Sequence, residues 1–371
     1  MIRISNLQIY CLLLLTTAPL AYLITPMVVS HMVGNNGWLA ILASIIPGAL
    51  LIYVYIYILK KSTRPFPAML EDCLGKIVGK SIGFLYVLAF LWGTAFTLSY
   101  FVALIGSSIV PETPLSVYFG AMLLTSYYAL KTGLQNIARI TELLILFGLP
   151  LAFLIVFISL AQHPDFNNLL PLASISYKNF GHAVFHSFFI LGDMMAILVL
   201  AYFSIDRAKV PRTLFQILYT YIALISLTAM VTIMSFGPDY ANLLSFPTFN
   251  MVRSITISDF IQNIDVVFIS IWIFGIFGSI SVKWFLACYT IQQVFALQDY
   301  RFLAAPTSVT IGIFSLILGE NIIESQIMIH SIMPIIYSIF YILIPLLVFF
   351  ILLFKPDPGA DVATGLKTPA A

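Results

Sequence analysis

The sequence predicts an all-α polytopic membrane protein with ten transmembrane helices, built as a 5+5 inverted repeat in which helices 1 and 6 are broken. Three observations predict it: an apolar composition, basic residues concentrated in alternate loops, and two irregular helices in matching positions. Hydrophobic residues make up 61% of the 371 residues and charged residues only 9%, with a mean hydropathy of +1.04. Since soluble domains contain roughly 25% charged residues, a chain so poor in charge is expected to lie in a membrane.

Ten apolar runs are predicted to span the bilayer, because about 20 residues of helix cross its ~30 Å hydrocarbon core. They cover residues 7–29, 38–59, 81–109, 115–130, 138–161, 180–203, 214–236, 260–290, 305–319 and 327–354. We expect one transmembrane domain over residues 1–354, with repeat one at about 7–161 and repeat two at about 180–354. Residues 355–371 lack apolar periodicity and are predicted to be a disordered tail.

Loop charge indicates the orientation of the chain. With the N-terminus inside, the alternation of spans places 14 of the 17 basic residues on the cytoplasmic side and only Lys178 and Arg253 outside. Cytoplasmic loops of membrane proteins are enriched in Lys and Arg, so both termini are predicted to be cytoplasmic. In the longer connections, we expect a short interfacial helix followed by a break within residues 60–80, and a small re-entrant or surface helix within residues 237–259.

The sequence does not indicate an enzyme, because it contains no Walker loop and no GxSxG, HExxH or GxGxxG motif. Cys11, Cys73 and Cys288 lie far apart and form no CxxC, so neither a disulfide framework nor a metal site is expected. We therefore expect no catalytic residues, no cofactor and no metal. The net charge of +2 suggests no nucleic-acid partner.

The first irregular helix carries Thr16, Thr17, Ala18 and Pro19 in the middle of its apolar run. A proline inside a helix removes one backbone hydrogen bond and clashes with the carbonyl four residues earlier. Carbonyls freed at membrane depth need a partner from protein, water or ligand, so helix 1 is predicted to unwind here. The alternative is a simple proline kink.

The second irregular helix is helix 6, where Leu191, Gly192 and Asp193 interrupt an apolar run at about the middle of the bilayer. Glycine weakens a helix, and a charge at that depth costs roughly 2.5–3.5 kcal/mol on insertion scales. Intramembrane acids usually face a cavity and serve a function, so helix 6 is predicted to break here. The alternative is a protonated, hydrogen-bonded aspartate with a structural role.

Broken helices at positions 1 and 6 of ten indicate the central site of an inverted-repeat transporter fold. We expect a mid-membrane ligand pocket between spans 1, 3, 6 and 8. Its expected ligand-binding residues are Thr16, Thr17, Ala18, Pro19, Thr97, Leu191, Gly192 and Asp193. Lys283 in span 8 has two interpretations: its amine replaces a bound cation between spans 1 and 8, or it extends to the cytoplasmic face.

Several short segments stand in order along the chain: NNGWLA (35–40), FPAMLEDCLGKIVGKSIG (66–83), ETPLSV (112–117), TGLQNIAR (132–139), DFNNLLPL (165–172), LGD (191–193) and FPTFNMVRS (246–254). With these segments and its ten spans, the whole chain resembles the spore germination permeases. Members of this family are the B subunits of endospore germinant receptors, within the amino acid–polyamine–organocation transporter superfamily.

The resemblance implies a LeuT-like fold and a germinant-sensing B subunit in the spore inner membrane. Such a subunit works with an A subunit and a lipoprotein C subunit, and it binds a small germinant, such as an amino acid. The alternative that the resemblance leaves open is a proton- or sodium-coupled amino acid transporter of the same fold.

Overall fold

The computed structural model of the chain describes residues 3–62, 64–109, 112–162, 165–172, 176–256, 264–318 and 322–354. That part of the chain is nearly all helical, with a single β-bridge between Ile4 and Ser204. The α-helices are α1 (Asn6–Val33), α2 (Gly37–Ala43), α3 (Ile45–Lys61), α4 (Phe66–Leu74), α5 (Lys76–Ser108), α6 (Leu115–Thr132), α7 (Leu134–Gln162), α8 (Tyr177–Ile190), α9 (Ile197–Leu200), α10 (Val210–Leu243), α11 (Pro247–Arg253), α12 (Ile264–Val294), α13 (Ala304–Leu318), α14 (Ile322–Ile327), α15 (Met333–Tyr337) and α16 (Ile344–Phe354). The short 3-10 helices are η1 (Gly34–Asn36), η2 (Phe166–Leu169), η3 (Leu191–Ala196), η4 (Ala201–Phe203), η5 (Arg207–Lys209) and η6 (Arg301–Leu303), and the π-helical segments are η7 (Met328–Ile332) and η8 (Ser338–Leu343).

Each predicted span corresponds to helix in the structure, with ends that differ by a few residues. Numbered by predicted span, helix 1 is α1, helix 2 is α2 with α3, helix 3 is α5, helix 6 runs from α8 to η4, helix 8 is α12, and helix 10 runs from α14 to α16. Within the described residues, eight segments are long and apolar enough to cross a membrane, so the chain is a multi-pass membrane protein. The count of ten stays a prediction, because the first segment, Asn6–Lys61, runs through the turn at Gly34, and α6 is not among the eight. The predicted disordered tail, residues 355–371, lies outside the described residues.

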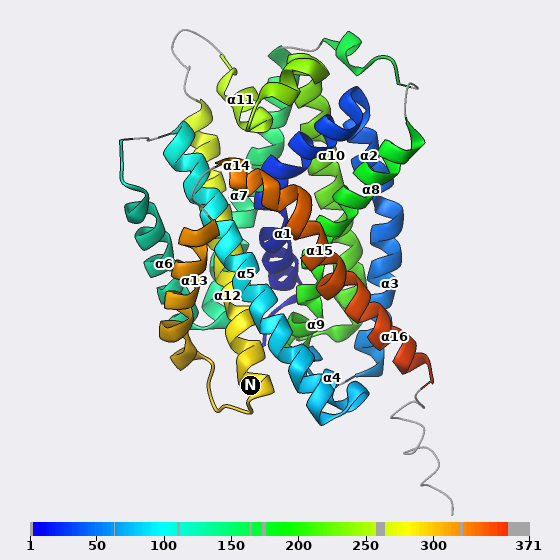
Figure 1. Cartoon of the computed structure of the whole chain (residues 1–371), viewed down its shortest axis with the longest axis vertical. Coiled ribbons are helices and arrows are strands. Elements are labelled where there is room, and N and C mark those ends of the chain that lie inside the picture. The colour runs from blue at the N-terminus through cyan, green and yellow to red at the C-terminus, as the bar shows by residue number, and fades with distance from the viewer. Residues whose placement is uncertain are drawn as a thin grey trace, which may run out of the picture.

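Helix α1 occupies the middle of the bundle, with α5 and α12 on one side and α8 and α10 on the other (Figure 1). Nearly every side chain from Cys11 to Ser30 is buried, so α1 packs against protein on all sides.

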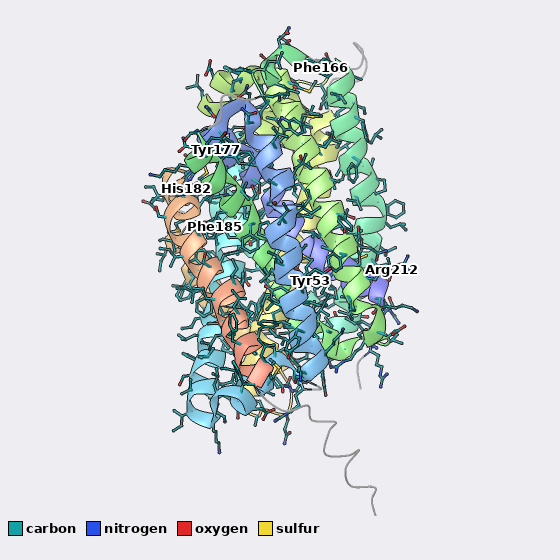
Figure 2. All side chains as sticks on the ribbon, turned by 90° about the vertical axis from the view of Figure 1, so that its right-hand side faces the viewer. Tyr53, Phe166, Tyr177, His182, Phe185 and Arg212 are labelled. Atoms are coloured by element: carbon teal, nitrogen blue, oxygen red, sulfur yellow. The ribbon has the colours of Figure 1, made fainter. Side chains whose placement is uncertain are left out.

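Apolar side chains also cover the outside of the bundle. Tyr53 on α3 and Phe185 on α8 point outward and are 61% and 46% exposed (Figure 2). Such a surface suits contact with lipid.

The chain begins and its last described helix ends at the same end of the bundle. Near the start of α1, the Ile4 N–H donates to the Phe203 carbonyl at 2.9 Å, which joins the N-terminal residues to the end of helix 6. Helix α16 ends near α4 at this end of the bundle, while α11 lies at the opposite end (Figure 1). This arrangement agrees with an even number of membrane crossings.

The predicted break in helix 1 is wrong. Helix α1 is a continuous α-helix of 28 residues that contains both Pro19 and Pro26. The Thr16 and Thr17 hydroxyls donate to the carbonyls of Leu12 and Leu13, at 2.7 and 2.9 Å. Because Pro19 removes only one N–H from the ladder and α1 is packed on every side, the helix absorbs the loss without unwinding.

Helix 6 is distorted where the break was predicted, although it tightens rather than unwinds. It runs as α8, changes to the 3-10 helix η3 at Leu191–Ala196, and continues as α9 and η4. A glycine is needed at position 192, next to the start of the 3-10 stretch, because Tyr341 leaves no room for a side chain. A Cβ on residue 192 would lie 2.8 Å from the Tyr341 Cβ. A 3-10 stretch inside a helix often marks a functional hinge.

The two smaller expected helices are present. Within residues 60–80, α4 is followed by a break at Gly75, which has a φ of +82° that glycine adopts readily. Within residues 237–259, α11 packs with Phe249, Met251 and Val252 buried.

The hairpin formed by α4 and α5 depends on Gly79. A Cβ at this position would lie 2.5 Å from the Glu71 Cα and 2.6 Å from the Leu70 carbonyl oxygen, which are backbone atoms that cannot move aside cheaply. We expect Gly79→Ala to lower the melting temperature of the purified protein by several degrees, since overpacking costs roughly 1–3 kcal/mol. Gly120→Ala is the matched control, because its Cβ would meet nothing within 4 Å. Equal melting temperatures for the two variants would contradict this account of the hairpin.

Candidate functional site

The centre of the site is a buried ion pair between helices 6 and 8. Lys283 Nζ on α12 lies 3.1 Å from Asp193 Oδ2 on η3, and the two side chains are only 3% and 4% exposed. Lys283 therefore does not extend to the surface, and one of its two interpretations is excluded. Its partner is the carboxylate on helix 6 rather than any group on helix 1.

Two further helices complete the surroundings of the pair. The Lys283 ammonium donates to the Thr97 hydroxyl on α5 at 3.4 Å, and the Tyr337 side chain on α15 lies beside the Asp193 carboxylate. Gly93, one turn before Thr97 on α5, faces the lysine stem, since a Cβ there would stand 4.0 Å from Lys283 Cδ, an ordinary van der Waals contact. Helices 3, 6, 8 and 10 therefore meet at one charged, water-poor point.

The π-helical segment η8 shapes helix 10 beside the pair. A π-turn displaces backbone carbonyls from the regular α-helical ladder, and such turns are frequent at functional sites. Here the Tyr55 hydroxyl on α3 donates to the Tyr341 carbonyl at 2.6 Å, and the Tyr86 hydroxyl on α5 donates to the Phe340 carbonyl. The ring of Tyr341 packs against Gly192, so the widened helix 10 lies on the tightened stretch of helix 6.

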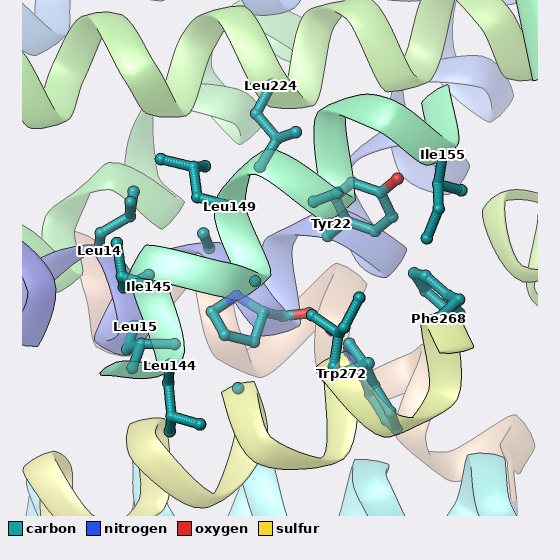
Figure 3. Close-up of a pocket in the computed structure, with 16 residues that line it drawn as sticks. Leu14, Leu15, Tyr22, Leu144, Ile145, Leu149, Ile155, Leu224, Phe268 and Trp272 are labelled. Atoms are coloured by element: carbon teal, nitrogen blue, oxygen red, sulfur yellow. Dashed lines mark hydrogen bonds between the residues drawn. The ribbon is translucent and has the colours of Figure 1, made fainter. Parts of the chain in front are cut away.

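The expected ligand-binding residues separate into four groups. Asp193 and Thr97 meet Lys283 at the ion pair, whereas Leu191 and Gly192 pack against helices 2 and 10. The Thr16 and Thr17 hydroxyls are bound within α1, and both side chains are buried. Ala18 and Pro19 line a separate apolar cavity between α1, α7, α10 and α12 (Figure 3).

Sequence reasoning missed the contribution of helix 10. Tyr337 and Tyr341 are four residues apart, so they lie on one face of a helix, and their rings are in contact at 4.7 Å. A buried tyrosine needs a partner for its hydroxyl, so this spacing in an apolar run was the available signal. It could not identify Asp193 as the partner, because that depends on how helix 10 lies against helix 6.

The charges of the pair cancel, so the site holds no free carboxylate. Among the described residues Asp193 is the one buried carboxylic acid and Lys283 the one buried lysine or arginine. In the same part of the chain, no three His, Cys, Asp or Glu side chains are placed to hold a metal ion.

Removing one member of the ion pair should destabilise the protein more than removing both. A lone buried charge costs roughly 3–5 kcal/mol, whereas replacing both partners by uncharged side chains is often nearly neutral. We expect Asp193→Asn and Lys283→Met each to lower the free energy of unfolding, measured by SDS titration, by about that amount. The double variant Asp193→Asn/Lys283→Met should recover most of the loss.

The exposed pair of Asp206 and Lys209 provides the control. Its atoms lie 3.0 Å apart, but the side chains are 40% and 71% exposed. The same substitutions there should change little, because exposed ion pairs contribute little to stability. If the effects at Asp193 and Lys283 were additive, the two side chains would not act as a pair.

Relatives of the chain are spore germination proteins. A profile of the family described as "Spore germination protein" matches residues 3–323. Spore germination protein KB of Bacillus subtilis (strain 168) is 26% identical over 361 residues, which cover 95% of each chain. Spore germination protein XB of Bacillus anthracis is 26% identical and covers 71% of this chain and 74% of its own.

Two solved transporters share the architecture. The structure of MhsT in complex with L-phenylalanine superposes with a TM-score of 0.65 at 14% identity, covering 98% of this chain and 99% of that one. Mhp1, a nucleobase-cation-symport-1 family transporter with bromovinylhydantoin bound, gives 0.63 at 10% identity, covering 92% and 79%. Both are LeuT-fold transporters, which confirms the predicted fold class; the repeat boundaries stay a prediction. With its multi-pass helices, its transporter fold and a family match over most of its length, the chain belongs to the spore germination protein family of permeases.

Proposed function

We propose that the protein is the germinant-sensing B subunit of a spore germinant receptor. In this role it lies in the spore inner membrane with both termini in the cytoplasm, beside an A subunit and a lipoprotein C subunit. It binds a small germinant, such as an amino acid, at the middle of the membrane and passes the binding event to its partners. Family membership and the names of the relatives support the setting, and the buried ion pair supports the binding.

The ion pair is the observation that carries the proposal. A free amino acid bears an ammonium and a carboxylate, which are the same two charges that Lys283 and Asp193 present to each other. If the ligand enters between them, its ammonium binds Asp193 and its carboxylate binds Lys283. Each buried charge then keeps a partner throughout, so the exchange avoids leaving an isolated charge in a low-dielectric site. The structural neighbour MhsT, whose complex contains L-phenylalanine, provides a precedent for an amino acid ligand in this fold.

The alternative is a proton- or sodium-coupled amino acid transporter, and its sodium-coupled form receives less support from the site. A sodium site at the centre would be favoured by a free carboxylate, and Asp193 is already neutralised by Lys283. In our proposal the Lys283 ammonium takes the place of a bound cation. Its partner is Asp193 on helix 6, whereas the expected cation position lay between helices 1 and 8.

Binding must also bias the conformation of surfaces that partners contact, because a ligand shifts an equilibrium only through its different affinities for two states. A chain of touching aromatic rings connects the ion pair to α4. The distances between successive ring centroids are 4.7 Å for Tyr337–Tyr341, 6.4 Å for Tyr341–Phe90, 6.0 Å for Phe90–Tyr86 and 5.3 Å for Tyr86–Phe66. Because Tyr337 lies beside Asp193 and Phe66 is the first residue of α4, a shift of helix 6 on binding has a packed route to the hairpin of α4 and α5.

Ligand binding tests the central step of the proposal. We expect the purified protein to be stabilised against heat by at least one compound in a panel of amino acids, sugars and nucleosides, equally in sodium and in choline buffer. A ligand present at 100 times its Kd adds about 2.7 kcal/mol to the stability of the folded state. The double variant Asp193→Asn/Lys283→Met should remain folded but lose this stabilisation.

The same double variant tests the role of the ion pair in spores, and an uptake measurement separates the receptor from the transporter. Spores whose only copy of the protein is the double variant should contain it at normal levels and fail to respond to that compound. Unchanged binding and germination would show that the pair is not the site. Sodium-dependent uptake of the compound into vesicles by the protein alone would instead favour the transporter.

Contact with the A subunit is expected at the hairpin of α4 and α5. Ile77, at the start of α5, is 83% exposed and offers an accessible position, whereas Ala68 on α4 is 8% exposed and does not. In a chain with Cys73→Ser, a cysteine introduced by Ile77→Cys should cross-link to the A subunit, and the yield should change with germinant. Leu124→Cys on α6, where the native side chain is 70% exposed, is the control and should not cross-link. If Ile77→Cys does not cross-link in a receptor that still responds, the signal leaves through another surface.

A further inference from the structure

One buried histidine lies outside the site described above. His186 on α8 is 3% exposed, and neither of its ring nitrogens has a hydrogen-bond partner. The backbone carbonyl of Ile329 lies near the ring, but not in hydrogen-bonding geometry. A neutral imidazole carries one donor and one acceptor, and a buried polar group without a bond is costly. A residue retained at this cost is a candidate for a function that needs a free imidazole.

A second imidazole lies beside it on helix 10. The ring centroids of His186 and His330 are 6.3 Å apart. His330 stands in the π-helical segment η7, and such turns are frequent at functional sites. His330 is exposed, and so is His31 in the last turn of α1, which lies near it. The two exposed rings connect the buried one with the end of the bundle at which α1 ends.

The two histidines of helices 6 and 10 lie between that end of the bundle and the ion pair. His186 precedes Asp193 by seven residues, about two helical turns, and His330 precedes Tyr337 by the same number. The Phe189 ring packs on both His186 and Tyr337, with centroid distances of 4.5 and 5.7 Å. Since Tyr337 lies beside Asp193, the contact of α8 with helix 10 covers the ion pair on this side.

The two imidazoles have no counter-charge. Within the described residues, neither His186 nor His330 takes part in an ion pair. The carboxylate that helix 6 itself carries, Asp193, is already neutralised by Lys283. The neighbouring helices bring only imidazole and phenol groups to this contact, and α2 brings no titratable group: His31, Tyr55, Tyr337 and Tyr341. Other charged or titratable groups stand nearer the starts of the two helices: Lys178, His182 and Glu324.

A proton on His186 is therefore opposed while the two helices are packed together. The charged imidazole would be buried without a counter-charge, next to a second ring that also takes up protons near neutral pH. If α8 moves away from helix 10, water reaches the ring and solvates the charge. The 3-10 stretch η3, which follows directly on α8, provides a point at which α8 can tilt.

We propose that His186, together with His330, is a proton-binding site, and that the bound proton favours a state in which α8 stands apart from helix 10. A ligand shifts an equilibrium through its different affinities for two states, and here the proton binds the separated state more tightly. One consequence, easier entry of a ligand to the ion pair, rests on the proposed function. The proton site itself does not.

The distance between two spin labels tests the proposal in the purified protein in nanodiscs. Phe185→Cys on α8 and Ile327→Cys on α14 provide label positions where the native side chains are 46% and 57% exposed. Cys73→Ser removes the partly exposed native thiol, and Cys11 and Cys288 are buried. As the pH falls from about 8 to about 5, across the range in which histidine titrates, a longer distance should appear. The ratio of the longer to the shorter distance should rise by up to about tenfold per pH unit, the limit for one proton.

His186→Gln separates the role of this imidazole from that of the others. Glutamine keeps a polar group of similar size but does not titrate, so the longer distance should no longer depend on pH. His182→Gln is the matched control, since His182 is exposed one turn earlier on α8, and it should leave the pH response unchanged (Figure 2). The double variant Asp193→Asn/Lys283→Met should also keep the response, which separates this proposal from that of the ion-pair site.

Three outcomes would overturn the proposal. The first is a distance that stays the same at both pH values in the chain with all its histidines. The second is a pH response that His186→Gln retains. The third is a response that the ion-pair double variant abolishes, because Asp193 would then be the group that titrates.

Hydrogen exchange in the unlabelled natural chain decides the question if His186→Gln does not fold. After correction for the intrinsic effect of pH, the amides of residues 183–190 should exchange faster at the lower pH. Equal corrected rates at both pH values would contradict the proposal.

Discussion

Asp193 and Lys283 are held 3.1 Å apart at a depth where neither charge has access to water. The attraction between them does not by itself make the fold stable, because removing two charges from water costs about as much as their contact returns. The pair constrains the fold, because each buried charge needs an opposite charge beside it. If one side chain moves, the other must move with it or another opposite charge must take its place. Helix 6 is thereby tied to helix 8, and Thr97 and Tyr337 bring helices 3 and 10 to the same point.

The backbone around the pair is irregular in two complementary ways. Helix 6 tightens into a 3-10 turn at η3, which brings Gly192 against Tyr341, while helix 10 widens into a π-turn at η8. The carbonyls of Phe340 and Tyr341 receive hydroxyl donors from Tyr86 and Tyr55, so these polar groups are satisfied inside the membrane. The irregular backbone of η8 is therefore stabilised by side chains of two other helices, α3 and α5.

The sequence allowed the spans and the distortion of helix 6 to be predicted, because hydropathy and an acid beside a glycine are local signals. It did not identify the partner of Lys283. That partner depends on the rotation of α12 and on the reach of the Lys283 side chain toward helix 6, which no local pattern encodes. The prediction that helix 1 unwinds at Pro19 was wrong for a related reason. The proline ring weakens a helix locally, but the burial of α1 on all sides decides whether the helix unwinds. The π-turn η8 of helix 10 has its carbonyls bound by Tyr55 and Tyr86, which are far away in sequence.

Helices 1 and 8 are held together in a different manner from helices 6 and 8. Along α12, the Trp272 N–H and the Ser279 hydroxyl donate to the carbonyls of Pro19 and Thr16 on α1, at 2.9 and 3.2 Å. Gly278 lets the Leu15 side chain come close to α12, since a Cβ there would lie 2.9 Å from Leu15 Cδ1.

None of these contacts between helices 1 and 8 can be exchanged for a charged ligand, because they join neutral groups in a packed interior. The contact of α12 with helix 6 is of the opposite kind, because it joins two charges, and in our proposal the two ends of a zwitterion take their places. Helix 1 and helix 8 are therefore expected to move as one body, and the 3-10 stretch of helix 6 is the element whose position a charged ligand can change.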